Sequence, residues 1–471
     1  MDRRVCTDRG RKAQDGSGGP HGKVSLSKEL VVVGGGLAGS EAAWQAASRG
    51  LQVTLYEMRP TRPTEVHRTD GLAEVVCSNS MGSLDPTRAP GLLKEELGRL
   101  GSMVMACAKA SAVPAGQALA VDRAIFSALV EERLKALPNL RIVREEVAAI
   151  PPGRPVILAS GPLTSPPLAD ALATLLGQEY LYFYDAASPI VATDSLRHEA
   201  LFAASRYGKN GDDYLNCPLD AAQYEAFLTA LTQAETVPFK DLDRPRFFES
   251  CLPIEELAAR GRDTLRFGPM KPVGLVDPKT GAVPHACVQL RAENLEGTMY
   301  NLVGFQTRMK WGEQRRVLRL LPGLENAEFL RYGVMHRNIF VNSPTFLAPT
   351  NELKGHEGLF LAGCLVGSEG YVECVASGWL AGVNAVRQTQ ERPMVSLPSD
   401  TCIGSLMRYL TESRAASFQP MNVNFGLFPP LSTAIRHKEA RQAAIVERAR
   451  QSLTAWLETA DLGKDLVACP S

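Results

Sequence analysis

The chain has 471 residues, a length that favours two or more domains and allows a large buried core. Lys and Arg together number 51, as do Asp and Glu, so the formal net charge at pH 7 is zero. This balance excludes a strongly basic chain, and the 45% of hydrophobic and 22% of charged residues exclude a disordered or fibrous one. No segment approaches the roughly 18 apolar residues that a membrane-spanning helix needs, so we expect no membrane association.

The N-terminal segment over 1–27 is polar and rich in Gly, and residues 1–28 hold seven Lys and Arg against three Asp, a local balance of +4. It contains no apolar core of a secretory signal, so we expect a disordered extension and a cytoplasmic protein. None of the ten cysteines forms a CxxC motif. The spacing excludes the usual dithiol and zinc-ribbon motifs, and we expect reduced thiols and no metal site.

A strand, a glycine-rich turn, a helix and a second strand are predicted at the start of the folded region. Residues 30–33 form an apolar β-branched run, residues 40–49 an Ala-rich helix, and residues 51–56 another strand. Glu57 follows Gly36 by 21 positions, a spacing typical of the acidic residue that binds the ribose of a dinucleotide. Glycines let the backbone approach a pyrophosphate at the helix N-terminus. The predicted turn consists of Gly34, Gly35, Gly36, Leu37, Ala38 and Gly39.

The later elements indicate an α/β fold. Apolar strands over 155–161 and 358–363 resemble the later strands of FAD-dependent oxidoreductases, and a helix is predicted after Gly370. We therefore expect a FAD-binding Rossmann-like domain assembled from both ends of the chain, with an inserted α+β domain. Other predicted elements are helices over 122–137, capped by Asp122, and 221–232, and strands over 141–144, 287–291 and 299–305. The expected divisions are 28–190 and 331–450 for the FAD-binding domain, 191–330 for the insertion, and 451–471 for a C-terminal tail.

Several segments between residues 29 and 450 resemble one known family. They include LYEMRP, EVVCSNS, FFESCLPIEELAARG, MYNLVGFQTRMKWGEQ, EGYVEC and FQPMNVNFGL. In these segments the chain is similar to the bacterial folate- and FAD-dependent tRNA (uracil-5-)-methyltransferases. The flavoproteins that modify the wobble uridine of tRNA share the glycine turn but not the other segments.

The resemblance implies a reaction and its cofactors. It implies that 5,10-methylenetetrahydrofolate supplies a methylene group, that reduced FAD supplies electrons, and that NADH or NADPH reduces the flavin again. The implied product is 5-methyluridine in the T-loop, so the implied partner is the T-arm of tRNA. The resemblance also extends the FAD-binding residues to Arg59, Gly363 and Gly370.

Cys251 and Cys77 match cysteines of this family. Carbon 5 of uracil is a poor nucleophile, and addition of a thiolate at carbon 6 produces an enolate that attacks the methylene group. A base must then remove the proton on carbon 5. Our hypothesis is that Cys251 attacks carbon 6 and that Cys77 assists near the flavin, with the reverse assignment left open. Tyr371 matches the position expected to stack on the folate.

Basic residues gather around Trp311. Five Lys and Arg against Glu313 give a local balance of +4 over residues 308–319, and a second basic group, with a balance of +3, lies around Arg441. A charged run is often only a solvated surface, but an aromatic ring among cations offers both base stacking and phosphate contact. The residues expected to bind tRNA are Arg308, Lys310, Trp311, Arg315 and Arg316.

Two other functions remain open at this point. A flavin oxidoreductase acting on a small molecule would show no acceleration of flavin turnover by tRNA. A flavin-bound RNA-binding protein without turnover would need neither cysteine. The chain also departs from the family pattern, because Cys364 stands at a usual Gln and Ser250 at a usual Gly.

Overall fold

The computed structural model describes residues 28–64, 66–153, 155–177, 181–208, 211–238 and 252–460. The expected N-terminal extension, residues 461–471 of the expected tail, and Ser250 and Cys251 lie outside the described residues. In the described part, no helix is long and apolar enough to span a membrane.

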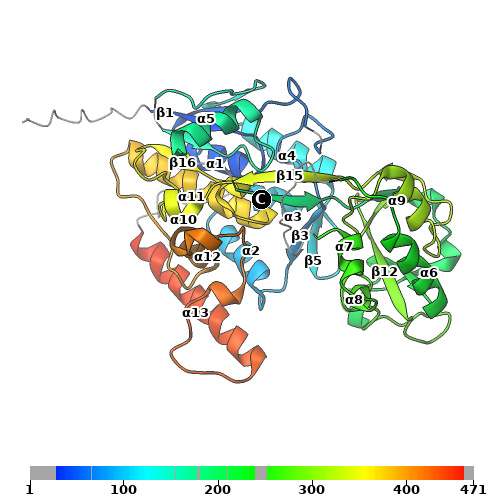
Figure 1. Ribbon diagram of the computed structural model, residues 1–471. Helices are drawn as coiled ribbons and strands as arrows, with labels where there is room; N and C mark the ends of the chain where they lie inside the picture. The colour runs from blue at the N-terminus through cyan, green and yellow to red at the C-terminus, as the bar shows by residue number, and fades with distance from the viewer. Residues whose placement is uncertain are drawn as a thin grey trace, which may run out of the picture.

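A five-stranded parallel sheet lies in the larger part of the molecule, on the left in Figure 1. Its strand order is β16-β7-β1-β2-β6. β16 comes from the C-terminal half of the chain and pairs with β7, so both ends of the chain build this sheet, as predicted. The strands are β1 (Glu29–Val33), β2 (Gln52–Tyr56), β6 (Leu140–Val143), β7 (Val156–Leu158) and β16 (Leu359–Leu361).

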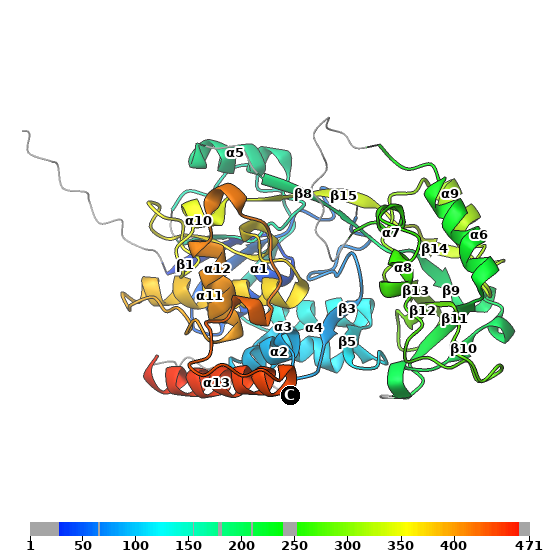
Figure 2. The same cartoon turned by 60° about the horizontal axis from the view of Figure 1, so that its bottom comes forward.

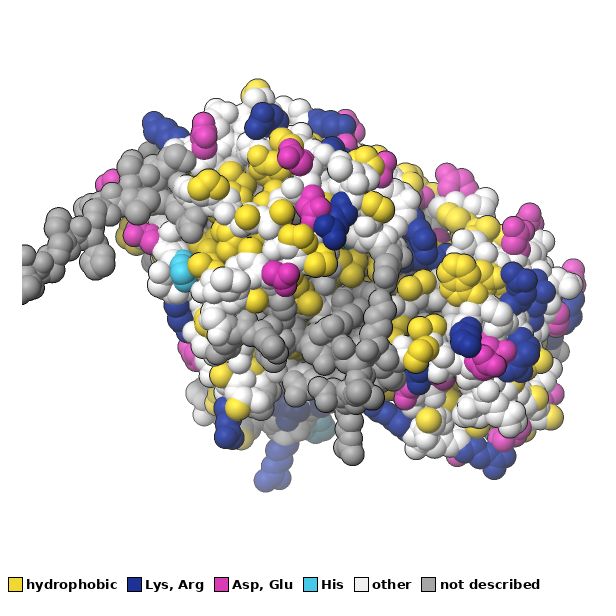
Figure 3. All heavy atoms as spheres, turned by 45° about the horizontal axis from the view of Figure 1, so that its top comes forward, with side chains coloured by type: hydrophobic (Ala, Val, Ile, Leu, Met, Phe, Trp, Pro, Cys, Tyr) yellow, Lys and Arg dark blue, Asp and Glu magenta, His cyan; other side chains and the backbone are white. Residues whose placement is uncertain are grey.

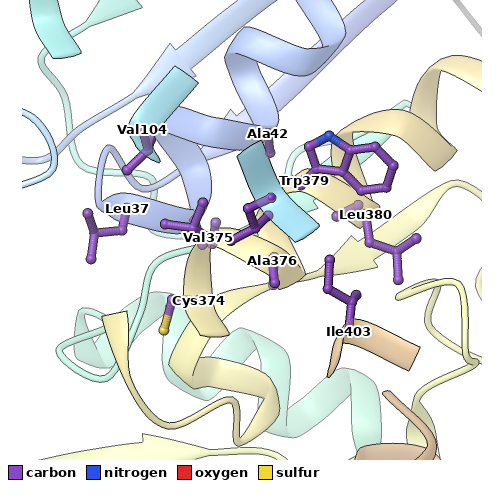
Figure 4. Close-up of a cluster of buried hydrophobic side chains, with 14 of the residues drawn as sticks. Leu37, Ala42, Val104, Cys374, Val375, Ala376, Trp379, Leu380 and Ile403 are labelled. Carbon is purple, nitrogen blue, oxygen red and sulfur yellow. The ribbon is translucent and has the colours of Figure 1, made fainter. Parts of the chain in front are cut away.

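Helices α1 (Leu37–Ala47) and α11 (Tyr371–Thr389) cross beside this sheet at a glycine contact. A β-carbon added at Gly378 would lie 2.1 Å from the carbonyl oxygen of Ala38, so only glycine allows the two backbones to approach this closely. The fully buried Trp379 donates a hydrogen bond from its indole nitrogen to the Leu100 carbonyl at 3.0 Å. Figure 4 shows this core, with side chains of α11 packed against those of α1 and of Ile403. α1 begins three residues before the predicted helix, directly at the glycine turn.

Further helices cover the larger part. Asp122 caps α4 (Arg123–Lys135) as predicted, because its carboxylate accepts hydrogen bonds from the amides of Ala124 and Ile125 at 3.0 Å. An ion pair at 2.7 Å between Arg450 and Glu95 ties α13 (Lys438–Thr459) to α2 (Ala89–Arg99), and Figure 2 shows α13 beneath α2. The others are α3 (Met103–Ala110), α5 (Pro166–Leu176), α10 (Ser343–Phe346) and α12 (Cys402–Glu412).

In the described residues, a six-stranded antiparallel sheet and the helices α6 to α9 form the smaller part, on the right in Figures 1 and 2. The strand order is β10-β11-β12-β13-β9-β14, and a second hydrophobic core fills the space between sheet and helices. The helix predicted over 221–232 is confirmed as α6, and the strands predicted over 287–291 and 299–305 as β12 and β13. The elements are β9 (Ile190–Ala192), β10 (Phe202–Ala203), β11 (Tyr214–Leu219), β12 (Ala286–Ala292), β13 (Met299–Leu302), β14 (Phe329–Arg331), α6 (Ala221–Thr232), α7 (Ile254–Ala259), α8 (Thr264–Phe267) and α9 (Trp311–Leu318).

Two smaller sheets lie outside these layers. β8 (Leu181–Ala186) and β15 (Met335–Phe340) form an antiparallel ribbon that leads from the larger to the smaller part in Figures 1 and 2. β3 (Ser80–Ser83), β5 (Ala118–Val121) and β4 (Ala112–Val113) form a three-stranded sheet next to the smaller part. The domain limits expected near residues 190 and 330 stay a prediction.

Candidate functional site

The glycine turn between β1 and α1 has the geometry of a ligand cradle. Gly34 has a φ of +106°, and a β-carbon there would lie 2.5 Å from the Ala159 carbonyl oxygen, so the turn requires glycine. A β-carbon at Gly36, in contrast, would meet nothing within 4 Å. No side chain in the described part of the chain caps α1, whose N-terminal amides and dipole favour an anion. The turn therefore keeps open space at the helix N-terminus.

Glu57 lies at the end of β2, beside this turn. Its carboxylate accepts hydrogen bonds from the Gly35 amide at 3.0 Å and from the Arg59 amide and Nε at 3.0 and 2.9 Å. Burial alone would raise the pKa of Glu57, but the hydrogen bonds and charge of Arg59 outweigh burial and lower the pKa. Arg59 also donates a hydrogen bond to Glu74 at 2.9 Å, so its guanidinium fixes the carboxylates of both Glu57 and Glu74. Glu57 is thus an ionised, fixed acceptor.

A cavity that is partly open to solvent extends along the carboxyl ends of the parallel strands. This edge is where α/β sheets of this kind bind ligands. The cavity brings together residues from both ends of the chain, including Tyr371. Of the residues expected to bind FAD, its lining includes Gly34, Gly36, Leu37, Ala38, Glu57, Arg59 and Gly363, whereas Gly35, Gly39 and Gly370 are not part of the lining.

Tyr371 joins the cavity to Cys77. Its hydroxyl lies 2.9 Å from the Cys77 sulfur, accepts hydrogen bonds from the amides of Cys77 and Ser78 at 2.9 and 3.2 Å, and donates to the Ser78 carbonyl at 2.9 Å. Burial, with a smaller contribution from Cys77, raises the pKa of Tyr371 well above its usual value, so the phenol stays protonated. The half-buried ring lines the cavity while the hydroxyl fixes the loop that carries the thiol.

Two arginines, of which Arg291 is buried, hold the Cys77 loop against β12, a feature that the sequence analysis missed. Arg291 donates from Nε to the Asn79 side chain at 2.9 Å and from Nη2 to the Ser78 hydroxyl at 2.8 Å. Arg123 pairs with Glu293, which follows β12, at 2.6 Å. Arg291 is an arginine in a wholly buried strand, and this unusual placement is the signal that could have revealed it. The smaller part of the molecule therefore helps to position Cys77.

Comparison with known proteins identifies the family. The family model described as glucose inhibited division protein A matches residues 29–393. The chain is 54% identical over 435 residues to the methylenetetrahydrofolate--tRNA-(uracil-5-)-methyltransferase TrmFO of Geobacter sulfurreducens, covering 92% of this chain and 100% of that protein. The chain belongs to the methylenetetrahydrofolate--tRNA-(uracil-5-)-methyltransferase family. A protein of the same name from Heliobacterium modesticaldum is 53% identical over 428 residues, which cover 91% of this chain and 98% of that protein.

A solved structure agrees with the fold expected for this methyltransferase family. The structure of Aquifex aeolicus GidA matches with a TM-score of 0.65 at 18% identity, covering 93% of this chain and 74% of that chain. The expected FAD-binding Rossmann-like fold is confirmed, with its parallel sheet built from both ends of the chain.

The structure places the residues expected to bind tRNA around α9, in the smaller part of this methyltransferase family member. Trp311 is 61% exposed and stacks on Tyr332, with ring centroids 5.4 Å apart and planes inclined by 13°. Phe329 also stacks on Tyr332, with ring centroids 5.4 Å apart and planes inclined by 14°. Arg315 donates to the Tyr332 hydroxyl at 2.8 Å. The aromatic stack Trp311–Tyr332–Phe329 was not predicted, because Tyr332 and Phe329 lie outside the basic run.

Three of the expected tRNA-binding cations are paired with carboxylates. Lys310 pairs with Glu235 at 2.7 Å, Arg316 pairs with Glu313 at 2.6 Å, and Arg308 pairs with Glu256. In the view of Figure 3, basic and acidic side chains accordingly alternate around exposed hydrophobic ones in the right-hand part. The local balance of +4 in the sequence thus overstates the positive charge of this surface.

Cys251, the hypothesised nucleophile of this methyltransferase family member, lies outside the described residues. The described chain resumes at Leu252, directly before α7, and the buried Glu255 of α7 accepts hydrogen bonds from the Thr307 hydroxyl at 2.8 Å and from the Arg308 amide at 2.7 Å. The segment after Cys251 is therefore anchored next to the residues expected to bind tRNA. In the described part of the chain, no group of three or more His, Cys, Asp or Glu side chains is arranged to hold a metal ion.

Proposed function

We propose that this protein methylates carbon 5 of a T-loop uridine in tRNA, with 5,10-methylenetetrahydrofolate as the carbon donor. FAD, once reduced, supplies the electrons that convert the transferred methylene group into a methyl group. NADH or NADPH reduces the flavin, and the reaction takes place in the cytoplasm. The name shared by the relatives supports methylenetetrahydrofolate, tRNA and carbon 5 of uracil as the reacting partners.

The cavity fits FAD. The uncapped N-terminus of α1 and the open space at Gly36 suit a pyrophosphate, and the ionised Glu57 retains acceptor capacity for the hydroxyls of a ribose. Arg59 acts on Glu57 rather than on the cofactor, because most of its donors bond to Glu57, Glu74 and two backbone carbonyls. Gly363 lines the cavity, and a β-carbon there would lie 2.9 Å from the β-carbon of Ala38, so this glycine also allows close packing against α1.

The contact between Tyr371 and Cys77 is the observation that carries the mechanism. The protonated phenol lies 2.9 Å from the Cys77 sulfur, and the Tyr371 ring forms part of the cavity wall, whereas Cys77 itself is not part of the lining. A thiol held in this way can give or take a proton beside the reacting uracil, which agrees with an assisting role for Cys77. Before this proton transfer, Cys251 adds to carbon 6 of the ring and makes carbon 5 nucleophilic.

The aromatic stack supports tRNA binding at the smaller part of the molecule. The exposed face of Trp311 continues the series of stacked rings and can accept an unstacked base, and Arg315 adds a cation at its edge. Phosphate contacts come from cations that exchange their carboxylate partners for phosphates. We therefore expect moderate affinity for tRNA.

One assay tests the proposed function. The purified protein is incubated with NADPH or NADH, 5,10-methylenetetrahydrofolate and unmodified tRNA, without S-adenosylmethionine, and 5-methyluridine is measured. We expect methylation that disappears when the folate or the nicotinamide is omitted. Methylation that requires S-adenosylmethionine, or flavin turnover without 5-methyluridine, would contradict the proposal.

A trapping experiment separates the two cysteines. Transfer RNA that contains 5-fluorouracil should form a covalent complex with the Cys77→Ala variant, because the carbon-6 adduct forms before the step that Cys77 assists. The Cys251→Ala variant should form none. The opposite pattern would reverse the two assignments without affecting the overall reaction.

A further inference from the structure

Two cysteines without a role in the proposed reaction meet at the wall of the cavity. The sulfur of Cys364 lies 3.3 Å from the sulfur of Cys374. Cys364 belongs to the 3-10 helix η5 (Gly363–Val366), Cys374 is the fourth residue of α11, and both line the cavity. A disulfide bond has a length of about 2.05 Å, so a small side-chain movement is enough to join them.

The two thiols differ in solvent exposure, as do the attacking and the resolving cysteine of a dithiol that undergoes thiol–disulfide exchange. Cys364 is half-buried, whereas Cys374 is only 6% exposed and its sulfur also lies 3.3 Å from the Ser368 carbonyl oxygen. In Figure 4, Cys374 lies at the margin of the packed core, away from Trp379. Cys364 is therefore the more accessible thiol of the pair.

A second pair of buried cysteines serves as a contrast. Cys217 and Cys287 lie on the paired strands β11 and β12, but the sulfur of Cys217 points to the Pro322 carbonyl at 3.0 Å. Burial raises the pKa of Cys217 well above its usual value and the pKa of Cys287 to about 12. These thiols are structural.

We propose that Cys364 and Cys374 form a redox-active dithiol whose substrate is a small-molecule disulfide. The Cys364 thiolate attacks one sulfur of this disulfide, the sulfur–sulfur bond of the substrate breaks, and one thiol leaves. Cys374 then attacks the Cys364 sulfur of the mixed disulfide and releases the second thiol. The two cysteines lose two protons and two electrons, and the substrate gains them as two thiols.

The new bond connects η5 to α11 along the cavity. The part of this inference that concerns the cofactor rests on the proposed FAD site. Because the bond fixes the cavity wall between Gly363 and Tyr371, the oxidised protein should release FAD several-fold more slowly than the reduced protein.

The full-length protein, as purified with its cofactor, is treated with oxidised glutathione and analysed by intact mass spectrometry. We expect a mass lower by two hydrogen atoms, restored by dithiothreitol, in the wild type but not in Cys364→Ser or Cys374→Ser. Cleavage after Glu369 and Glu373 should yield peptides joined through Cys364 and Cys374, while Cys217 and Cys287 stay unlinked. A stable glutathione adduct, or no reaction, would overturn the dithiol. If the bond forms and FAD release is unchanged, only the effect on the cavity is wrong.

Discussion

A β-carbon added at Gly36 meets no protein atom within 4 Å, and the φ of −74° suits any amino acid. The Gly36→Ala variant should therefore fold with a free energy of unfolding within about 1 kcal/mol of the wild type, since only the N-cap preference changes. The added methyl group occupies the space expected for the pyrophosphate, so the purified variant should lose its flavin absorbance. Flavin content and urea unfolding of the same preparation provide the measurement.

The neighbouring Gly34 is the matched control, because its φ is +106° and its β-carbon would lie 2.5 Å from a backbone oxygen. Gly34→Ala should lose both FAD and stability. A Gly36→Ala protein that keeps a full complement of FAD would show that the cofactor does not approach this turn.

Tyr371 combines a ring at the cavity with a hydroxyl at Cys77, and two substitutions separate these roles. Tyr371→Phe keeps the ring but leaves the amides of Cys77 and Ser78 without their acceptor, which should cost about 1–3 kcal/mol of unfolding free energy. We expect tRNA methylation to fall while the apparent folate affinity stays the same. Tyr371→Ala should lower the folate affinity as well. If Tyr371→Phe methylates tRNA at the wild-type rate, the hydroxyl has no part in placing Cys77.

Individual site residues differ in whether the sequence could predict their place in the site. The glycine turn and Glu57 lie within a short segment whose spacing reflects a local geometry, so they were found. The contact between Cys77 and Tyr371 joins residues 294 positions apart and leaves no local pattern. The family resemblance identified both residues separately, but only the fold brings them together. Arg123 and Arg291 were missed because their partners also come from distant segments.

At the scale of elements, the N-terminus of α12 depends on a carboxylate from α2. Glu96 is buried and accepts hydrogen bonds from the amides of Cys402 and Ile403 at 2.7 and 3.1 Å. Burial, only partly offset by these hydrogen bonds, raises the pKa of Glu96 from 4.5 to about 7. Because Glu96 binds its proton more tightly in the folded state than in the unfolded state, its protonation stabilises the fold. This contribution is complete below the unfolded-state pKa and is lost as the pH rises through about 7.

The free energy of unfolding should fall by about 3 kcal/mol between pH 4.5 and pH 8, because the pKa of Glu96 is shifted to about 7. The Glu96→Gln variant cannot ionise at this position, so its free energy of unfolding should vary less with pH than that of the wild type. Urea unfolding of both proteins at pH 5 and pH 8.5 measures the difference. Lys94, whose pKa burial lowers to about 8, is present in both and cancels in the comparison. Parallel pH dependences would contradict the assignment.

The helices and strands that were predicted, such as α4, α6 and β12, agree with the structure to within a few residues, because amphipathic periodicity and caps such as Asp122 are local. At the scale of the whole molecule, the parallel sheet from both ends of the chain was predictable through the resemblance of two apolar strands. The β8–β15 ribbon that connects the two parts was not, because its pairing joins segments about 150 residues apart and neither strand alternates clearly. The net charge of a sequence segment was a poor predictor of surface charge, because ion pairs in the fold neutralise much of the basic run around Trp311.

The salt dependence of tRNA binding tests whether the residues around α9 form the tRNA-binding surface. Arg315 contacts the Tyr332 hydroxyl, so Arg315→Gln should weaken tRNA binding and lower the slope of log affinity against log salt by about one. Trp311→Ala should weaken binding by about 1–3 kcal/mol with an unchanged slope, because stacking releases no counterions. Arg262→Gln, which removes an exposed arginine between α7 and α8, is the matched charge control and should leave the slope unchanged. Flavin reduction should be equal in all three variants. If Arg262→Gln lowers the slope as much as Arg315→Gln does, tRNA is attracted by the overall field of the smaller part rather than bound at the aromatic stack.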